Sequence, residues 1–136
     1  MYNLHRFITA QEHQYSKALN EVKKGRKQSH WMWYIFPQIA GLGHSDMAKF
    51  YAIIDLQEAK EYFAHPILGA RLIEISKALL EIEGKTVNHI FGSPDDMKLR
   101  SCMTLFSFLE NTDPVFQAVL DKYFNGEKDT KTLALF

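Results

Sequence analysis

Cysteine and long hydrophobic runs are both scarce in this sequence. Cys102 is the one cysteine among 136 residues, which excludes an internal disulfide and a zinc site built from several cysteines. The longest uncharged apolar run, residues 31–36, is far shorter than the roughly 20 residues that a membrane-spanning helix needs. Residues 1–6 contain no apolar signal core. We therefore expect a cytoplasmic protein that does not bind membranes.

An excess of charge of either sign is also missing. Sixteen Lys and Arg residues balance sixteen Asp and Glu residues, which argues against bulk electrostatic binding to nucleic acid or to an anionic membrane. No repeat, low-complexity tract or linker rich in Pro, Gly or Ser divides the chain. The sequence therefore predicts a single globular domain over residues 1–136 that does not bind nucleic acid.

Hydrophobic residues, in contrast, are plentiful and follow a helical pattern. They make up 46% of the chain, which is typical of a globular domain, and they recur at steps of three and four residues. Residues 4–24 fit one helix with room for a break near Thr9, and residues 66–84 fit a longer one. Residues 30–38 fit a buried strand and a short buried helix equally well. Further helical segments are expected at residues 45–51, 58–64, 86–91, 93–109, 113–126 and 129–136.

Helix-start signals support these segments. Ser45, Ser93 and Asp129 stand where a capping side chain is expected, and Pro66, Pro94 and Pro114 suit a first helical turn. The sequence therefore predicts an all-α fold, a single compact multi-helix domain of about seven short helical segments.

The first candidate site lies in residues 26–38. Lys27 can pair with an anion, and His30 is the best candidate for a catalytic proton carrier because imidazoles serve that role near neutral pH. Trp31 or Trp33 can stack on a planar ring. The alternative is a buried aromatic cluster with polar residues at its rim. In the binding interpretation, the residues that supply orienting hydrogen bonds are Gln38 and Ser45.

A second candidate lies on the predicted helix after Pro94. Lys98, Ser101 and Thr104 fall within an arc of about 120°, so their polar ends share one flank that can hold a phosphate or carboxylate. The alternative is a solvated helix face. If both segments serve one site, Lys98 and Ser101 should share a pocket with Lys27 and His30, and Lys98 should have no carboxylate partner.

No signal for a metal, a cofactor or a reactive thiol is present. The six histidines include no pair three to five residues apart, and no phosphate-binding or dinucleotide-binding glycine motif occurs. Cys102 has no activating neighbour in the sequence and reads as a small core residue. We expect neither a metal site nor a cofactor.

Several strings together resemble one known family. They run from His30-Trp31-Met32-Trp33 through Phe36-Pro37-Gln38 to the Gly41-Leu42-Gly43 turn, and continue with 65–72, 90–92, 103–106 and 123–133. They look like the bacterial domain-of-unknown-function family 1810, whose members are often labelled calpastatin in genome annotation. The resemblance implies a compact multi-helix domain and carries no established activity. Calpastatin-type inhibitors are disordered and poor in core residues, unlike this chain.

Two functions follow as hypotheses. The first is a small-ligand-binding domain, with or without enzymatic activity, for an anionic nucleotide-like or sugar-phosphate ligand. The second is a non-catalytic protein-interaction or regulatory module. A polar-lined cleft that brings the two candidate segments together would favour the first, and a flat exposed aromatic patch would favour the second.

Overall fold

The computed structural model describes residues 2–136, and all regular elements within that range are helices. The predicted all-α fold is confirmed, with ten helices where about seven segments were expected; the predicted segment 4–24 is divided into two helices. The helices are α1 (His5–Gln11), α2 (Tyr15–Lys23), α3 (Met32–Ile35), α4 (Asp46–Phe50), α5 (Leu56–Ala64), α6 (Leu68–Leu80), α7 (Val87–Phe91), α8 (Asp95–Ser107), α9 (Val115–Phe124) and α10 (Thr130–Leu133).

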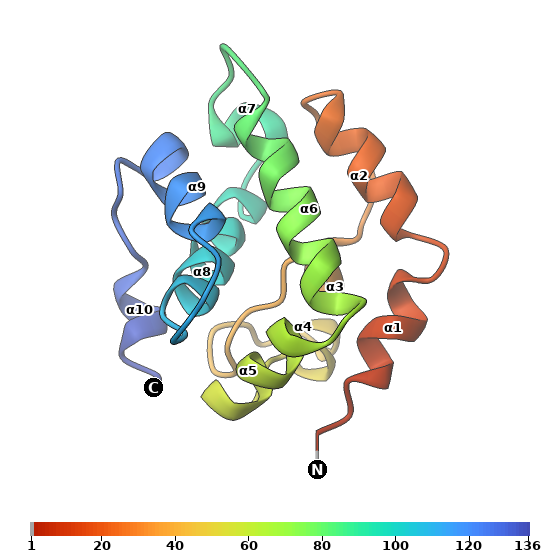
Figure 1. Ribbon diagram of the computed structural model, residues 1–136. Coiled ribbons are helices and arrows are strands. Elements are labelled where there is room, and N and C mark those ends of the chain that lie inside the picture. Colours follow the sequence, from red (N-terminus) through yellow and green to blue (C-terminus); the bar gives the residue numbers. More distant parts are fainter. Residues whose placement is uncertain (1) are drawn as a thin grey trace.

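Helix α6 is the centre of the arrangement. Figure 1 shows it between α2 on one side and α9 on the other, and it packs against both and against α5. Helix α8 lies behind this row and packs against α9, α7, α5 and α10. The predicted apolar stripe of the long helix is buried, as expected for a central element; its members are Leu68, Leu72, Ile75, Leu79 and Ile82.

The first predicted helix is two helices, α1 and α2, and the break lies at residues 12–14 rather than near Thr9. The side-chain amide of Gln11 donates to the Tyr34 carbonyl at 2.7 Å, which fixes the end of α1 against α3. The Tyr15 hydroxyl donates to the Arg71 carbonyl at 3.1 Å, which fixes the start of α2 against α6. The chain turns between these anchors because the two helices pack on different neighbours.

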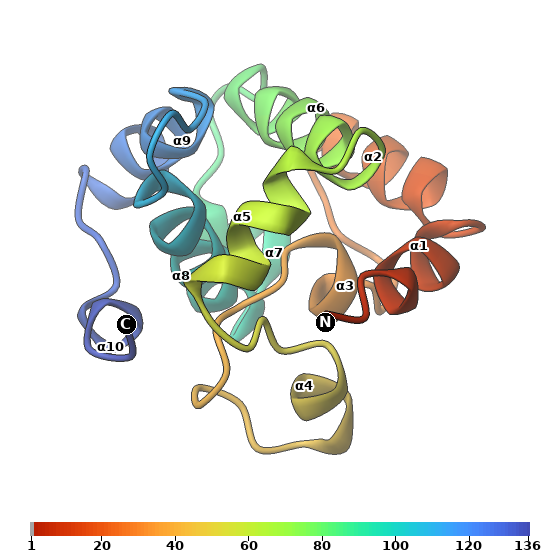
Figure 2. The same cartoon turned by 60° about the horizontal axis from the view of Figure 1, so that its bottom comes forward.

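The ambiguous segment 30–38 contains a single helical turn, α3, with Trp31, Met32 and Phe36 buried. Beyond Pro37 the chain is extended, and Ile39 forms an isolated parallel bridge with Ile53. The Ala40 amide donates to the Ile53 carbonyl at 2.8 Å, and the Ile53 amide donates to the Gln38 carbonyl at 2.8 Å. This bridge closes a loop, residues 38–53, that carries α4 and stands at the edge of the molecule in Figure 2.

Two of the three predicted capping residues cap a helix. Ser45 Oγ accepts from the Ala48 amide at 3.1 Å, and Asp129 Oδ2 accepts from the Thr132 amide at 3.2 Å. The prediction that Ser93 caps α8 is wrong. Pro94 occupies the capping position, and Ser93 Oγ instead donates to Asp96 Oδ1 at 3.4 Å. Within the first turn of α8, Asp96 Oδ1 accepts from the Met97 amide at 2.8 Å.

Across residues 2–136 no helix is both long enough and apolar enough to cross a lipid bilayer.

Candidate functional site: a cavity beside α3, α4 and α8

A small cavity of about 130 Å³ opens between α3, the 38–53 loop and α8. Its polar walls come from four elements, and most of the remaining wall is apolar side chain and glycine backbone. The lining residues whose side chains carry a polar group are Trp33 of α3, Gln38, Lys49 of α4, Tyr51 and Lys98 of α8. The cavity thus joins the two segments that the sequence marked separately.

A buried ion pair holds the outer wall of this cavity in place. The Arg6 guanidinium pairs with the Glu58 carboxylate at 2.9 Å, and the Glu58 side chain is 0% exposed. The same guanidinium donates to the carbonyls of Phe50 at 2.8 Å and Ala52 at 2.7 Å, at the end of α4. Glu58 also accepts from the Ile54 amide at 2.8 Å. The loop is therefore anchored to α1 and α5 by two buried charged groups, and leaving either of them unpaired would destabilise the fold.

Gly43 allows the loop to approach α4 closely. A Cβ atom at Gly43 would lie 2.5 Å from the Cβ of Ala48, a distance that side chains do not tolerate. The sequence motif Gly41-Leu42-Gly43 therefore has a packing role, and both glycines line the cavity.

Two lysines share one carboxylate at the inner wall. Lys27 Nζ lies 2.8 Å from Asp95 Oδ2, and Lys98 Nζ lies 3.6 Å from Asp95 Oδ1. Lys98 Nζ is also 5.4 Å from the ring centre of Trp33, and Lys27 Nζ is 5.2 Å from that of Trp31. Because one negative charge faces two positive ones, this group keeps an excess of positive charge. The Lys98 side chain is 27% exposed, so its ammonium remains accessible.

The expectation that Lys98 has no carboxylate partner is wrong. Asp95 lies three residues earlier on α8, at a spacing that brings the two side chains together. From the sequence alone, Asp95 is only an acidic residue in the first turn of a helix. Its second role depends on Lys27, which reaches it from a distant part of the chain.

Three of the eight predicted site residues line the cavity: Trp33, Gln38 and Lys98. Lys27 stands beside them through Asp95. His30 is exposed and is not among the lining residues.

The other three predicted residues have structural contacts. Trp31 is 0% exposed, and its indole Nε1 donates to Glu21 Oε1 at 2.9 Å. Ser45 caps α4. Ser101 Oγ donates to Asp129 Oδ2 at 3.0 Å and so ties α8 to the segment that starts α10. The polar lining residues that sequence reasoning missed are Lys49 and Tyr51, which no local pattern distinguishes.

Glu21 organises the segment that carries Lys27 and Trp31. Its Oε1 accepts from the amides of Gln28 at 2.7 Å and Ser29 at 2.9 Å as well as from Trp31, and its Oε2 accepts from Ser29 Oγ at 2.7 Å. Burial alone would raise the pKa of Glu21, but these hydrogen bonds outweigh it and lower the pKa to about 2. Sequence reasoning missed Glu21, because the donors that it accepts from lie beyond the end of α2.

The polar groups of the cavity wall are ammonium, amide, phenol and indole groups. In the part of the chain that the structure describes, the cavity wall contains no histidine, cysteine or carboxylate. Cys102 is fully buried, and burial raises the pKa of its thiol well above the ordinary value. Within residues 2–136 no three His, Cys, Asp or Glu side chains gather as a metal site would require.

Comparisons with known proteins place the chain in a family. The family model described as "Protein of unknown function (DUF1810)" matches residues 1–136. The crystal structure of the conserved hypothetical protein Rv1873 from Mycobacterium tuberculosis is similar, with a TM-score of 0.96 and 44% sequence identity over 98% of this chain and 95% of that chain. No curated protein matches the sequence. The chain therefore belongs to the DUF1810 family of proteins of unknown function.

Proposed function

We propose that this protein is a cytoplasmic binding protein for a small anionic molecule, which enters the cavity and contacts the Lys98 ammonium. The observation that carries the proposal is the shared carboxylate. Asp95 faces both Lys27 and Lys98, so one positive charge is left uncompensated beside the exposed part of Trp33. An anion that reaches Lys98 gains a charge-assisted hydrogen bond without leaving Asp95 unpaired, because Lys27 keeps the shorter contact.

The cavity volume limits the ligand. About 130 Å³ is close to the roughly 150 Å³ of a cavity known to hold benzene, and well below the roughly 300–1,000 Å³ of sites for drug-sized ligands. One ring or one phosphate or carboxylate group therefore fits inside. The rest of a nucleotide or sugar phosphate would extend beyond the rim. A planar ring that carries an anionic group matches both Trp33 and Lys98.

Binding rather than catalysis is the role that the wall chemistry supports. General acid–base catalysis near neutral pH relies most often on a histidine or a carboxyl group within hydrogen-bond reach of the substrate. His30, the proton carrier expected from the sequence, is not a lining residue, and the described wall offers lysine, tyrosine and amide groups instead.

Calorimetric titration with phenyl phosphate, benzoate, nucleoside monophosphates and sugar phosphates tests this proposal. At least one ligand with a ring and an anionic group should bind, and a ligand at 100 times its Kd should stabilise the fold by about 2.7 kcal/mol. Lys98→Ala should abolish binding, and the control Lys131→Ala, at an exposed position of α10 that does not line the cavity, should not. Equal binding by Lys98→Ala and the parent protein would overturn the proposal. If none of these ligands binds, the proposal is overturned in favour of the second hypothesis, a non-catalytic protein-interaction or regulatory module.

A further inference from the structure

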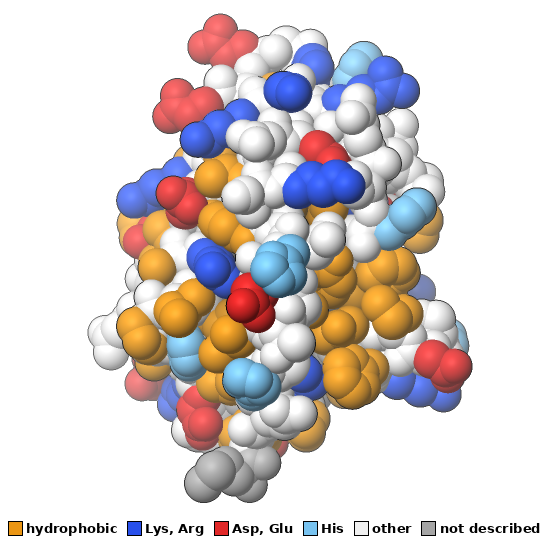
Figure 3. Space-filling view, turned by 90° about the vertical axis from the view of Figure 1, so that its right-hand side faces the viewer, with side chains coloured by type: hydrophobic (Ala, Val, Ile, Leu, Met, Phe, Trp, Pro, Cys, Tyr) orange, Lys and Arg blue, Asp and Glu red, His pale blue; other side chains and the backbone are white. Residues whose placement is uncertain are grey.

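A second recess lies on the outer side of α2 and shares no lining residue with the cavity. Its volume is about 690 Å³. It is walled by α2, the residues that follow it and α7, and we call it the α2 basin. Figure 3 shows many Lys, Arg and His side chains on the upper part of this face of the molecule. The basic and imidazole residues of the basin are His13, Lys17, Lys24, Arg26, Lys85 and His89.

The positive charges of the α2 basin are largely uncompensated. Among the ion pairs of residues 2–136, none involves Lys17, Lys24, Arg26 or Lys85. The single acidic lining residue is Glu21, which is only 7% exposed and directs its carboxylate to inner donors. The four cations exceed this one carboxylate by three. In a chain with zero net charge, such a local excess marks a surface that attracts anions.

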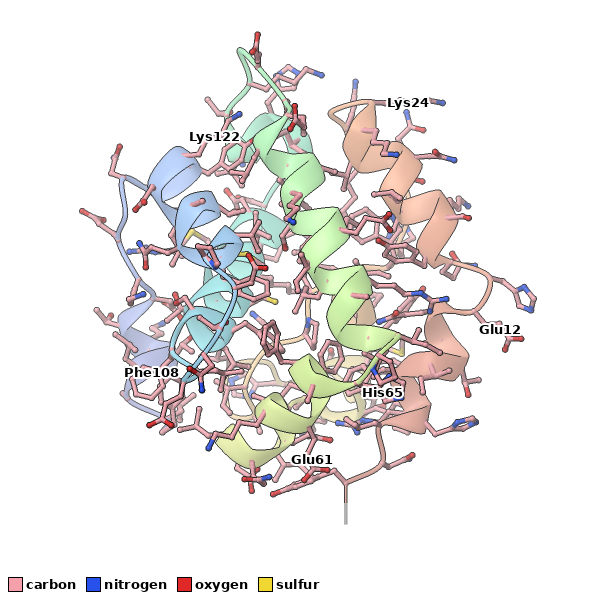
Figure 4. All side chains as sticks on the ribbon, viewed as in Figure 1. Glu12, Lys24, Glu61, His65, Phe108 and Lys122 are labelled. Carbon is pink, nitrogen blue, oxygen red and sulfur yellow. The ribbon has the colours of Figure 1, made fainter. Side chains whose placement is uncertain are left out.

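The cations come from three segments of the chain: α2, the residues that follow it, and the segment before α7. Lys17 and Lys24 are seven residues apart on one side of α2, which separates their positions by about 10 Å along the axis. Figure 4 shows Lys24 at the C-terminal end of this helix. Lys85 comes from the segment before α7, where its ammonium donates to the Gly25 carbonyl at 3.2 Å. An anion in the basin can therefore meet positive charge from α2 and from the segment before α7.

We propose that the α2 basin binds a small molecule with two or more linked phosphates. A run of about 10 Å between cations suits several consecutive phosphates better than a single one. The remaining lining residues, Ser16, Asn20 and Gln28, supply further hydrogen-bond donors. The volume of about 690 Å³ is in the range of small-molecule sites.

The residue types that line the α2 basin favour such a small molecule over a nucleic acid. Single-stranded nucleic acids are held by aromatic side chains on which the bases stack. The described lining of the α2 basin contains no Phe, Tyr or Trp. The basin therefore recognises the phosphates of the ligand and not the group attached to them.

Calorimetric titration with inorganic tripolyphosphate at low ionic strength tests the proposal. We expect saturable binding with one site, which weakens as salt is added because the contacts are electrostatic. The double variant Lys24→Ala/Arg26→Ala should bind at least about tenfold more weakly, because each cation lost removes a charge-assisted hydrogen bond. The matched control Lys60→Ala/Lys131→Ala removes the same charge from α5 and α10 and should bind within about twofold of the parent.

Three results would overturn the proposal. They are the absence of tripolyphosphate binding, equal weakening in both double variants, and a single-stranded oligonucleotide that binds the basin more tightly than tripolyphosphate. Lys98→Ala should leave tripolyphosphate binding unchanged, which separates this site from the cavity. Circular dichroism of each variant checks that the fold is retained.

Discussion

At the scale of single residues, buried charges determine the shape of both recesses. Glu21 gathers donors from three residues and thereby fixes the segment that leads to Lys27 and Trp31. Its side chain lines the α2 basin, and its carboxylate accepts hydrogen bonds from the segment 28–31. This role was missed from the sequence, because a glutamate in an amphipathic helix ordinarily faces solvent.

Glu21→Gln should lower the free energy of unfolding by about 1–3 kcal/mol at pH 7, because an amide oxygen accepts these hydrogen bonds less strongly than a carboxylate. The folded pKa of about 2 lies below the ordinary value of 4.5. The charge therefore stabilises the fold above about pH 4.5, and this contribution is lost as the pH falls towards 2. Urea unfolding at pH 7 and pH 3 should show a smaller difference between variant and parent at pH 3.

The control for this experiment is Glu12→Gln, because Glu12 is exposed in the turn between α1 and α2 and projects away from the molecule in Figure 4. It should change stability by no more than about 0.5 kcal/mol at either pH. A Glu21→Gln effect that is equal at pH 7 and pH 3 would contradict the ionised, hydrogen-bonded state assigned to Glu21.

The ion pair of Arg6 gives a second test at the residue scale. Arg6→Met should destabilise the protein by about 3–5 kcal/mol, because it leaves the fully buried Glu58 carboxylate without its cation. The double variant Arg6→Met/Glu58→Gln should recover part of this loss, since the uncompensated charge is then absent. Urea unfolding measures both. A single variant as stable as the parent would show that the pair does not anchor the loop.

At the scale of elements, local signals predicted where most helices begin. Tertiary contacts determined the features that these signals did not predict. Ser45 and Asp129 cap helices as the sequence indicated, because capping involves residues only three positions apart. The break between α1 and α2 was misplaced because the anchors of Gln11 and Tyr15 lie on α3 and α6, far along the chain. The Ile39–Ile53 bridge had no local signal for the same reason.

Gly43→Ala tests the close approach of the loop and α4. The new Cβ would meet the Cβ of Ala48 at 2.5 Å, so α4 must shift, at a cost of about 1–3 kcal/mol, and the cavity should lose its ligand. In the double variant Gly43→Ala/Ala48→Gly the nearest atom is the Cα of residue 48, at 3.9 Å. Ligand binding by calorimetry should then return, although glycine inside α4 lowers stability by about 1 kcal/mol. No recovery would contradict the steric explanation.

At the scale of the whole molecule, equal numbers of acidic and basic residues conceal an uneven distribution of charge over the surface. The equal numbers of acidic and basic residues gave no sign of the local excess of positive charge in the α2 basin. The convergence of Lys27 and Lys98 was anticipated, whereas Ser101 lies on the α10 side of α8. The position of a residue in a helix gives the direction of its side chain around the helix axis. The packing of the neighbouring helices decides whether that direction faces a cavity.

Because the cavity and the α2 basin share no lining residue, their ligands should bind independently. The affinity for phenyl phosphate should be the same within about twofold with and without saturating tripolyphosphate. Titration calorimetry in both orders measures this. Mutual exclusion would show that the two anions compete for one site.

The most direct test of the central claim, that a small anion binds in the cavity at Lys98, uses the two indole N–H signals in a proton–nitrogen NMR spectrum. Trp33 lines the cavity, and Trp31 is buried with its indole bonded to Glu21, so one reports on the site and the other is an internal control. On addition of phenyl phosphate, the Trp33 signal should shift in a saturable way while the Trp31 signal stays nearly fixed, and Lys98→Ala should abolish the shift. An unmoved Trp33 signal, or an undiminished shift in Lys98→Ala, would contradict the account.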